Sequence, residues 1–147
     1  MKKFSYRIGV DVSKSTLDLH CNEHNVHIKI SNDSEGFKVF RKWLNDLKIP
    51  TNDVLIVMEF TGGYEYRLIQ YCESKSIAYA RISGLAIKKS MGIVRGKNDK
   101  VDAFRIAQYA DEMQKILEPS RPLNKTILDI KELLGLRKKI SSRKCWL

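Results

Sequence analysis

Two aspartates three positions apart stand at the start of a helical pattern in the second half of the chain. Asp99 and Asp102 follow a segment that contains Gly92 and Gly96, and apolar side chains then recur at helical spacing. This spacing places both carboxylates on one face of the helix, where they repel each other. A divalent cation would relieve that repulsion, so the pair is a candidate metal site. The simpler alternative is a helix cap beside a solvated acid.

Two further acids stand at or near the ends of predicted strands. Asp11 lies near the end of a β-branched run at residues 6–12, and Glu59 lies near the end of an almost wholly apolar run at residues 53–60. A run of that kind is typical of a strand that is buried on both faces. A charge at the end of such a strand needs a partner, because an unpaired charge is costly to bury. Taken singly, each acid could equally be an ordinary surface residue beside a turn.

The order of the predicted elements favours one α/β fold class. Short connections link the first three strands, which predicts an antiparallel meander, and Ser34 is the predicted N-cap of the helix that follows. Strands and helices then alternate as in a parallel sheet. The expected strands span residues 6–12, 16–21, 26–30, 53–60 and 77–82, and the expected helices span 34–49, 64–72 and 84–92, followed by the helix that carries the two aspartates. This is the layout of a ribonuclease H-like domain, a mixed five-stranded sheet with flanking helices.

In that layout the first and fourth strands are neighbours, so Asp11 and Glu59 would point to one spot on the sheet. The helix that bears Asp99 and Asp102 would close that spot. Four converging carboxylates repel one another unless cations neutralise them. Two Mg²⁺ or Mn²⁺ ions roughly 3.5 to 4 Å apart are the usual solution, and they clamp the oxygens of a phosphodiester displacement. We therefore expect a two-metal site.

The charge distribution points to a polyanionic partner. The 147 residues carry a net charge of +10, and residues 81–147 hold 16 basic and 7 acidic side chains against 11 and 10 in residues 1–80. The second half is therefore the expected phosphate-facing half. The candidate phosphate-binding residues are Lys88, Lys89, Arg95, Lys97 and Lys100. A solvated basic face is the alternative.

The end of the chain predicts a long basic helix from about Leu123. Apolar residues recur there at alternating spacings of four and three, as in the start of a coiled coil. We expect residues 1–115 to form the ribonuclease H-like domain and residues 116–147 to form a linker and this helix. The apolar face would have no cover within the chain, which predicts self-association, most simply as a dimer.

Other features are less specific. The three cysteines are widely spaced and are expected to be reduced thiols, and no apolar run reaches membrane-spanning length, so a cytoplasmic protein is expected. The three histidines, His20, His24 and His27, lack ligand spacing and are predicted to lie at the surface.

Three blocks of sequence resemble one known family. The blocks are Ile8-Gly9-Val10-Asp11-Val12-Ser13-Lys14, Val57-Met58-Glu59-Phe60-Thr61-Gly62-Gly63-Tyr64 and Lys97-Asn98-Asp99-Lys100-Val101-Asp102-Ala103. They are similar to the DEDD transposases and recombinases of IS110-type bacterial insertion sequences. The resemblance implies that Asp11, Glu59, Asp99 and Asp102 are the metal-binding, catalytic acids of a RuvC-like domain that acts on DNA.

The resemblance also carries expectations about the rest of the protein. Family members continue into a second domain with a serine nucleophile, and some use a guide RNA from the element. We therefore expect this chain to correspond to the N-terminal domain, and we expect no complete recombination from residues 1–147 alone.

Three other functions fit parts of the pattern. A sugar-kinase or actin-like ATPase shares the first block but needs two such domains around a nucleotide. A RuvC-like Holliday-junction resolvase shares the fold and the acids and would cut four-way junctions. A non-catalytic remnant would bind nucleic acid in a salt-dependent way without cleaving it.

Overall fold

The computed structural model describes residues 2–91, 98–122 and 125–144. The candidate residues Arg95 and Lys97 therefore lie outside the described residues, as does Leu123. The strands are β1 (Tyr6–Val12), β2 (Thr16–Cys21), β3 (Val26–Ser31), β4 (Val54–Glu59) and β5 (Ala78–Ile82), and the helices are α1 (Ser34–Asp46), α2 (Tyr66–Ser74), α3 (Gly84–Met91), α4 (Asp99–Glu112) and α5 (Lys125–Lys144).

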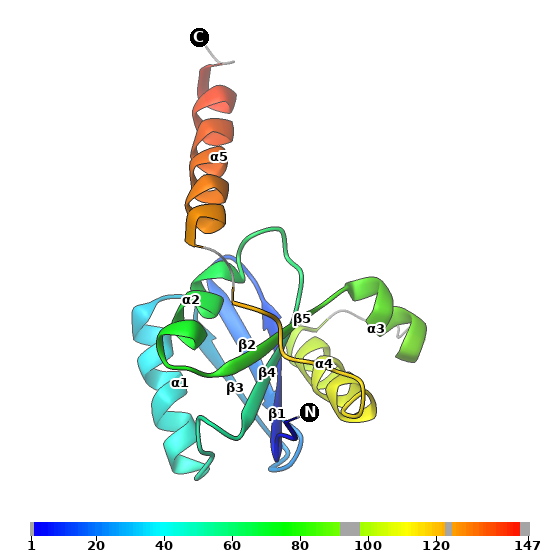
Figure 1. The fold of residues 1–147 in the computed structure, drawn as a ribbon. Helices are drawn as coiled ribbons and strands as arrows, with labels where there is room; N and C mark the ends of the chain where they lie inside the picture. The colour runs from blue at the N-terminus through cyan, green and yellow to red at the C-terminus, as the bar shows by residue number, and fades with distance from the viewer. Residues whose placement is uncertain (1, 92–97, 123–124, 145–147) are drawn as a thin grey trace.

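The five strands form one mixed sheet in the order β3-β2-β1-β4-β5. The first three strands are antiparallel, whereas β1 pairs in parallel with β4 and β4 pairs in parallel with β5. Helices α1 and α2 cover one face of the sheet, and α3 and α4 lie on the other side (Figure 1). The predicted ribonuclease H-like arrangement, with the first and fourth strands side by side, is confirmed.

Each face of the sheet has its own apolar core because successive residues of a strand point to opposite faces. Ile8, Val10 and Ile56 belong to the core beneath α1 and α2. Leu55 and Val57 belong to the core on the α4 side. The central strand β4 therefore contributes to both cores, which explains its almost continuous apolar sequence.

Helix α4 lies directly on the backbone of β1. A Cβ atom added to Gly9 would stand 2.3 Å from the backbone nitrogen of Ala107 and 2.4 Å from the carbonyl oxygen of Ala103. Only glycine leaves room for this approach, and small alanines face it from the helix. The other end of α4 is fixed by Asp111, which accepts hydrogen bonds from Arg7 and, at 2.7 Å, from the Asn22 amide. The close contact at Gly9 and the hydrogen bonds of Asp111 together hold α4 in place on the sheet.

The N-caps of α1 and α4 differ in position from the simplest prediction. Ser34 is not the cap of α1, because the Asp33 carboxylate accepts a hydrogen bond from the Gly36 amide at 2.9 Å. In α4 the cap is Asn98, whose side-chain oxygen accepts from the Lys100 amide at 3.0 Å. Asn98 thus does the capping, and the carboxylate of Asp99 remains available for other contacts.

The last helix, α5, extends away from the sheet (Figure 1). Its described apolar side chains are exposed by about half or more, and they are Ile127, Ile130, Leu133, Leu134 and Leu136. Within the described ranges, no helix has both the length and the apolar composition needed to span a bilayer.

Replacing Gly9 by alanine should destabilise the domain, because the new methyl group meets backbone rather than a side chain that can move. Overpacking of this kind costs about 1–3 kcal/mol. Chemical denaturation should show the loss as a lower midpoint. The control is Gly135→Ala in α5, where nothing lies within 4 Å of the added atom, and it should not lower the midpoint. An unchanged midpoint in Gly9→Ala would contradict the close packing of α4 on β1.

Candidate metal centre

Asp11 lies at the centre of a cluster of acids. Its side chain is half-buried near the end of β1. Burial and the surrounding negative charges raise its pKa to about 7 from an ordinary value of 3.8. In order of decreasing effect, the charges that contribute to this shift are Asp102, Asp99, Asp18 and Glu59. The other three acids singled out in the sequence thus act on the charge of Asp11, and so does a fifth acid that was not singled out.

The fifth acid, Asp18, was not a sequence candidate. It lies on β2 directly opposite Asp11 in the antiparallel register, so both side chains point to the same face of the sheet. Carboxylate oxygens of Asp11, Asp18 and Asp99 all lie within 4.8 Å of one another. The signal was present in the sequence, because a tight hairpin at residues 13–15 pairs position 11 with position 18.

A lysine of β3 offsets part of the negative charge, and a histidine of the same strand contacts one of the acids. The Nε2 atom of His27 lies 2.9 Å from a carboxylate oxygen of the buried Asp18. The Lys29 ammonium lies 3.8 Å from Asp18 and 4.0 Å from Asp99, at a position where the lysine is 54% exposed. Lys29 is therefore a solvent-accessible counter-ion that links the sheet to the start of α4.

The predicted surface location of the histidines is wrong for His20. This residue is 5% exposed because α4 packs over β2 at this point, and its ring meets the edge of Phe104 at 4.9 Å. Burial lowers the pKa of His20, and the nearby His27 and Lys100 lower it further. His20 is thus mainly a packing residue between the sheet and the helix beside the acids.

Glu59 lies at the end of β4, and its carboxylate is close to Gly84. A Cβ atom on Gly84 would lie 2.0 Å from a carboxylate oxygen of Glu59. Since Glu59 is paired in register with Ile82, two residues before Gly84, the first turn of α3 lies beside the carboxylate. Any other residue at position 84 would displace the Glu59 side chain.

The loop after Glu59 is held by a buried ion pair that the sequence did not indicate. Glu65 is fully buried, and one of its oxygens lies 2.8 Å from the Arg81 guanidinium. Its other oxygen accepts hydrogen bonds from the Thr61 hydroxyl and, at 3.0 Å, from the Gly63 amide. Burial alone would raise the pKa of Glu65, but these hydrogen bonds outweigh it and the pKa is lowered. The loop thus folds around the charged carboxylate of Glu65, and these contacts fix the direction in which the chain leaves Glu59.

The cluster fits a divalent cation. Carboxylates from β1, β2, β4 and α4 lie close enough to Asp11 to act on its charge, and oxygen ligands of this kind suit Mg²⁺ and Mn²⁺. The pKa of Asp11 is raised first by burial and then by the neighbouring carboxylates, and a bound cation would oppose both effects. The donor set and its electrostatics therefore agree with a metal-binding role.

The described basic candidates lie on the same side of the sheet. Lys88 and Lys89 are exposed on α3, which packs against α4, and Lys100 is exposed in the first turn of α4. They are therefore open to solvent on the elements that flank the acids.

Comparison with known protein families matches residues 8–144 to the DEDD transposase family of IS110-type elements. The match covers nearly the whole chain. The chain belongs to this transposase family. The family match favours a recombinase over the resolvase alternative.

Two curated relatives are pilin gene-inverting proteins, from Moraxella lacunata and Moraxella bovis. Each is 30% identical over 118 residues, which cover 76% of this chain and 36% of the relative. The chain thus spans about a third of the length of these curated relatives. Among solved structures, a T. thermophilus RuvC in complex with a Holliday junction substrate aligns with a TM-score of 0.49 and 14% identity, covering 78% of this chain and 99% of that one.

The metal-free domain should lose stability as the pH rises from about 4 to about 7. The folded protein holds a proton on Asp11 up to a pKa of about 7, whereas the unfolded chain releases it near 3.8, so the folded state binds more protons in this interval. Asp11→Asn should remove this slope. In EDTA at pH 8 it should be more stable than the parent by about 1–2 kcal/mol, a value that allows for solvent screening at a half-exposed group.

Denaturation midpoints between pH 4 and 8 would check this. The control is Asp46→Asn, which changes an exposed acid at the end of α1 and should leave the slope as it is in the parent. A parent whose stability rises over the whole interval, with Asp11→Asn following it, would contradict the crowding of charges around Asp11.

Proposed function

We propose that this domain is the metal-dependent catalytic part of an insertion-sequence recombinase and that it acts on the phosphodiester backbone of DNA. The convergence of carboxylates on Asp11 is the observation that carries the proposal. Membership of the DEDD transposase family supports it. The site would use Mg²⁺ or Mn²⁺, and two ions would suit the number of acids.

Asp11, Glu59, Asp99 and Asp102 are the proposed ligands and catalytic acids. When bound, divalent ions polarise a phosphodiester and lower the pKa of an attacking oxygen. The protein's part is to hold the acids in place: the β-hairpin presents Asp11 beside Asp18, and the packing of α4 on Gly9 brings Asp99 and Asp102 to them. His27 orients the Asp18 carboxylate through its hydrogen bond.

Lys88, Lys89, Arg95, Lys97 and Lys100 are the proposed DNA contacts. Of these, Lys88, Lys89 and Lys100 are described and exposed. Contacts from basic side chains to phosphates do not read the DNA bases, so their contribution to binding would be the same for every DNA sequence. They would draw the DNA backbone toward the acids, which would otherwise repel it.

We propose that the complete recombinase is longer than this chain. We propose residues 1–115 as the catalytic domain and residues 116–147 as a linker and a helix that pairs with a second copy. A second domain that supplies a serine nucleophile, and a guide RNA from the element, belong to the same proposal for the complete protein. The relatives, of which the chain covers 36%, support a longer protein.

Manganese ions should raise the melting temperature of the parent domain, because a ligand that binds only the folded state stabilises it by mass action. At a concentration 100 times the dissociation constant the gain is about 2.7 kcal/mol. Asp11→Asn combined with Asp102→Asn should abolish the rise. Asp46→Asn, the exposed control acid, should keep it. Equal shifts in the parent and in the double variant would mean that the ions bind elsewhere.

Replacing Lys88 and Lys89 by alanine should weaken DNA binding for every sequence tested. Removing one phosphate contact should lower the slope of log K against log salt by about 0.9 on duplex DNA, so removing two should lower it by about 1.8. Fluorescence anisotropy over a range of salt concentrations measures this slope. The control is Lys42→Ala with Lys115→Ala, which removes the same charge from exposed positions outside the proposed surface. Weaker binding to one sequence only would contradict a backbone contact.

The exposed apolar face of α5 should make the chain self-associate at tens of micromolar, in the concentration range where weak helical pairs form. Light scattering should give the mass of a dimer for the parent. Ile130→Glu with Leu134→Glu should give a monomer, whereas Ile116→Glu, which changes a residue that is 73% exposed outside α5, should remain dimeric. A monomeric parent would overturn the proposed pairing.

A further inference from the structure

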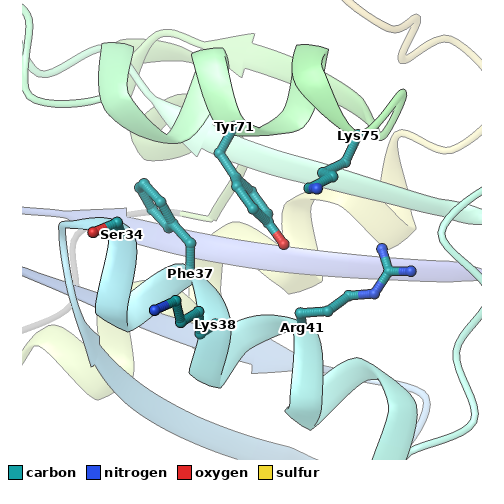
Figure 2. A pocket seen from close by; sticks show the side chains of 6 residues that line it. All are labelled: Ser34, Phe37, Lys38, Arg41, Tyr71 and Lys75. Atoms are coloured by element: carbon teal, nitrogen blue, oxygen red, sulfur yellow. The ribbon is translucent and has the colours of Figure 1, made fainter.

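A cleft with basic and aromatic walls lies between α1 and α2 (Figure 2). Its volume is about 380 Å³. The residues that line it are Ser34, Phe37, Lys38 and Arg41 from α1 and Tyr71 and Lys75 from and just after α2. Because α1 and α2 cover the face of the sheet opposite α4, this cleft is separate from the carboxylates.

Two cations in the cleft lack a carboxylate partner among the described residues. Lys38 forms an ion pair with Glu35 at 3.0 Å on the surface of α1. Arg41 and Lys75, in contrast, form no ion pair with any described acid. The two come from different helical segments and line one cleft, so an anion in the cleft would meet positive charge from both segments.

The aromatic wall supplies a hydrogen-bonding group and a fixed surface. The Phe37 and Tyr71 rings are stacked with centroids 4.8 Å apart, and Tyr71 points from α2 toward α1 with its hydroxyl on the side of Arg41 and Lys75 (Figure 2). Burial raises the pKa of Tyr71, against a smaller opposite effect of Arg41. The hydroxyl therefore carries its proton at neutral pH and can donate to an anion.

This combination of groups matches one kind of ligand. Proteins that hold single-stranded nucleic acid combine a positively charged groove with aromatic side chains. A volume of 380 Å³ is near the small end of the roughly 300–1,000 Å³ range of ligand sites, so it would admit about one nucleotide unit rather than a duplex. A buried apolar pocket would favour a neutral ligand, whereas three of the residues that line this cleft are cations.

We propose that the cleft between α1 and α2 binds the phosphate backbone of a single-stranded nucleic acid, with Arg41 and Lys75 holding a phosphate and the Tyr71 hydroxyl donating to it. The domain then contacts nucleic acid on both faces of its sheet. One strand lies at the cleft, and another segment reaches the carboxylates. The cleft needs no divalent ion, so its role does not depend on the metal site.

The test measures binding of fluorescein-labelled single-stranded RNA and DNA of mixed sequence, and of the matching duplex, in EDTA and over a range of salt concentrations. Arg41→Ala with Lys75→Ala should lower the slope of log K against log salt by about 1.4 for the single strands, at about 0.7 for each phosphate contact removed. The same variant should change duplex binding less. Tyr71→Phe, which keeps the ring, should weaken single-strand binding without a change in this slope, because it removes no charge.

The matched control is again Lys42→Ala with Lys115→Ala, which removes two exposed charges outside the cleft. It should leave the single-strand slope near that of the parent. Equal effects of the cleft variant and the control would overturn the proposal, as would an equal weakening of duplex and single-strand binding. All four substituted cations are exposed, so each variant should fold, and equal melting temperatures would confirm it. Since EDTA removes divalent ions, failure here leaves the metal site untouched.

Discussion

The contact between α4 and the backbone of β1 at Gly9 determines where the acids lie. Because a side chain at Gly9 would collide with backbone atoms of Ala103 and Ala107, the helix rests on the strand itself. Asp11 stands two residues beyond Gly9 on the strand, and Asp99 and Asp102 stand in the first turn of the helix, just before the contact. A shift of the helix by one residue would rotate its carboxylates away from the sheet. Charge repulsion then opposes this arrangement, and apolar packing along the rest of α4 maintains it.

The sequence predicted the sheet well, and physical reasons explain why. Strand β4 is apolar on both faces, which identifies a central strand, and the three-strand meander leaves β1 as its neighbour. That order predicted that Asp11 and Glu59 would lie near each other and near α4; in the structure Asp99 of α4 belongs to the cluster around Asp11, and Glu59 acts on it through its charge. Their role as metal ligands stays a proposal, because carboxylates close together are compatible with several occupants.

The residues that sequence reasoning missed depend on register and on tertiary burial. Asp18 joins the cluster only because the hairpin pairs it with Asp11, and His20 is buried only because α4 crosses β2. Glu65 was unremarkable in a helical pattern, because its partner Arg81 lies on a later strand and only the fold brings the two together. The cap of α1 moved by one residue because Asp33 and Ser34 are both competent caps and local geometry decides between them. Arg95 and Lys97 lie outside the described residues.

The central claim is that the carboxylates around Asp11 hold divalent metal. The most direct measurement is anomalous X-ray diffraction from crystals of the domain soaked in Mn²⁺. The account predicts anomalous density between the carboxylates of Asp11 and those of Glu59, Asp99 and Asp102, at ligand distances of roughly 2.0–2.2 Å for the small octahedral ions that such sites take. It also predicts that Lys29 leaves its position between Asp18 and Asp99. Strong manganese peaks at other places, with none among these acids, would contradict it.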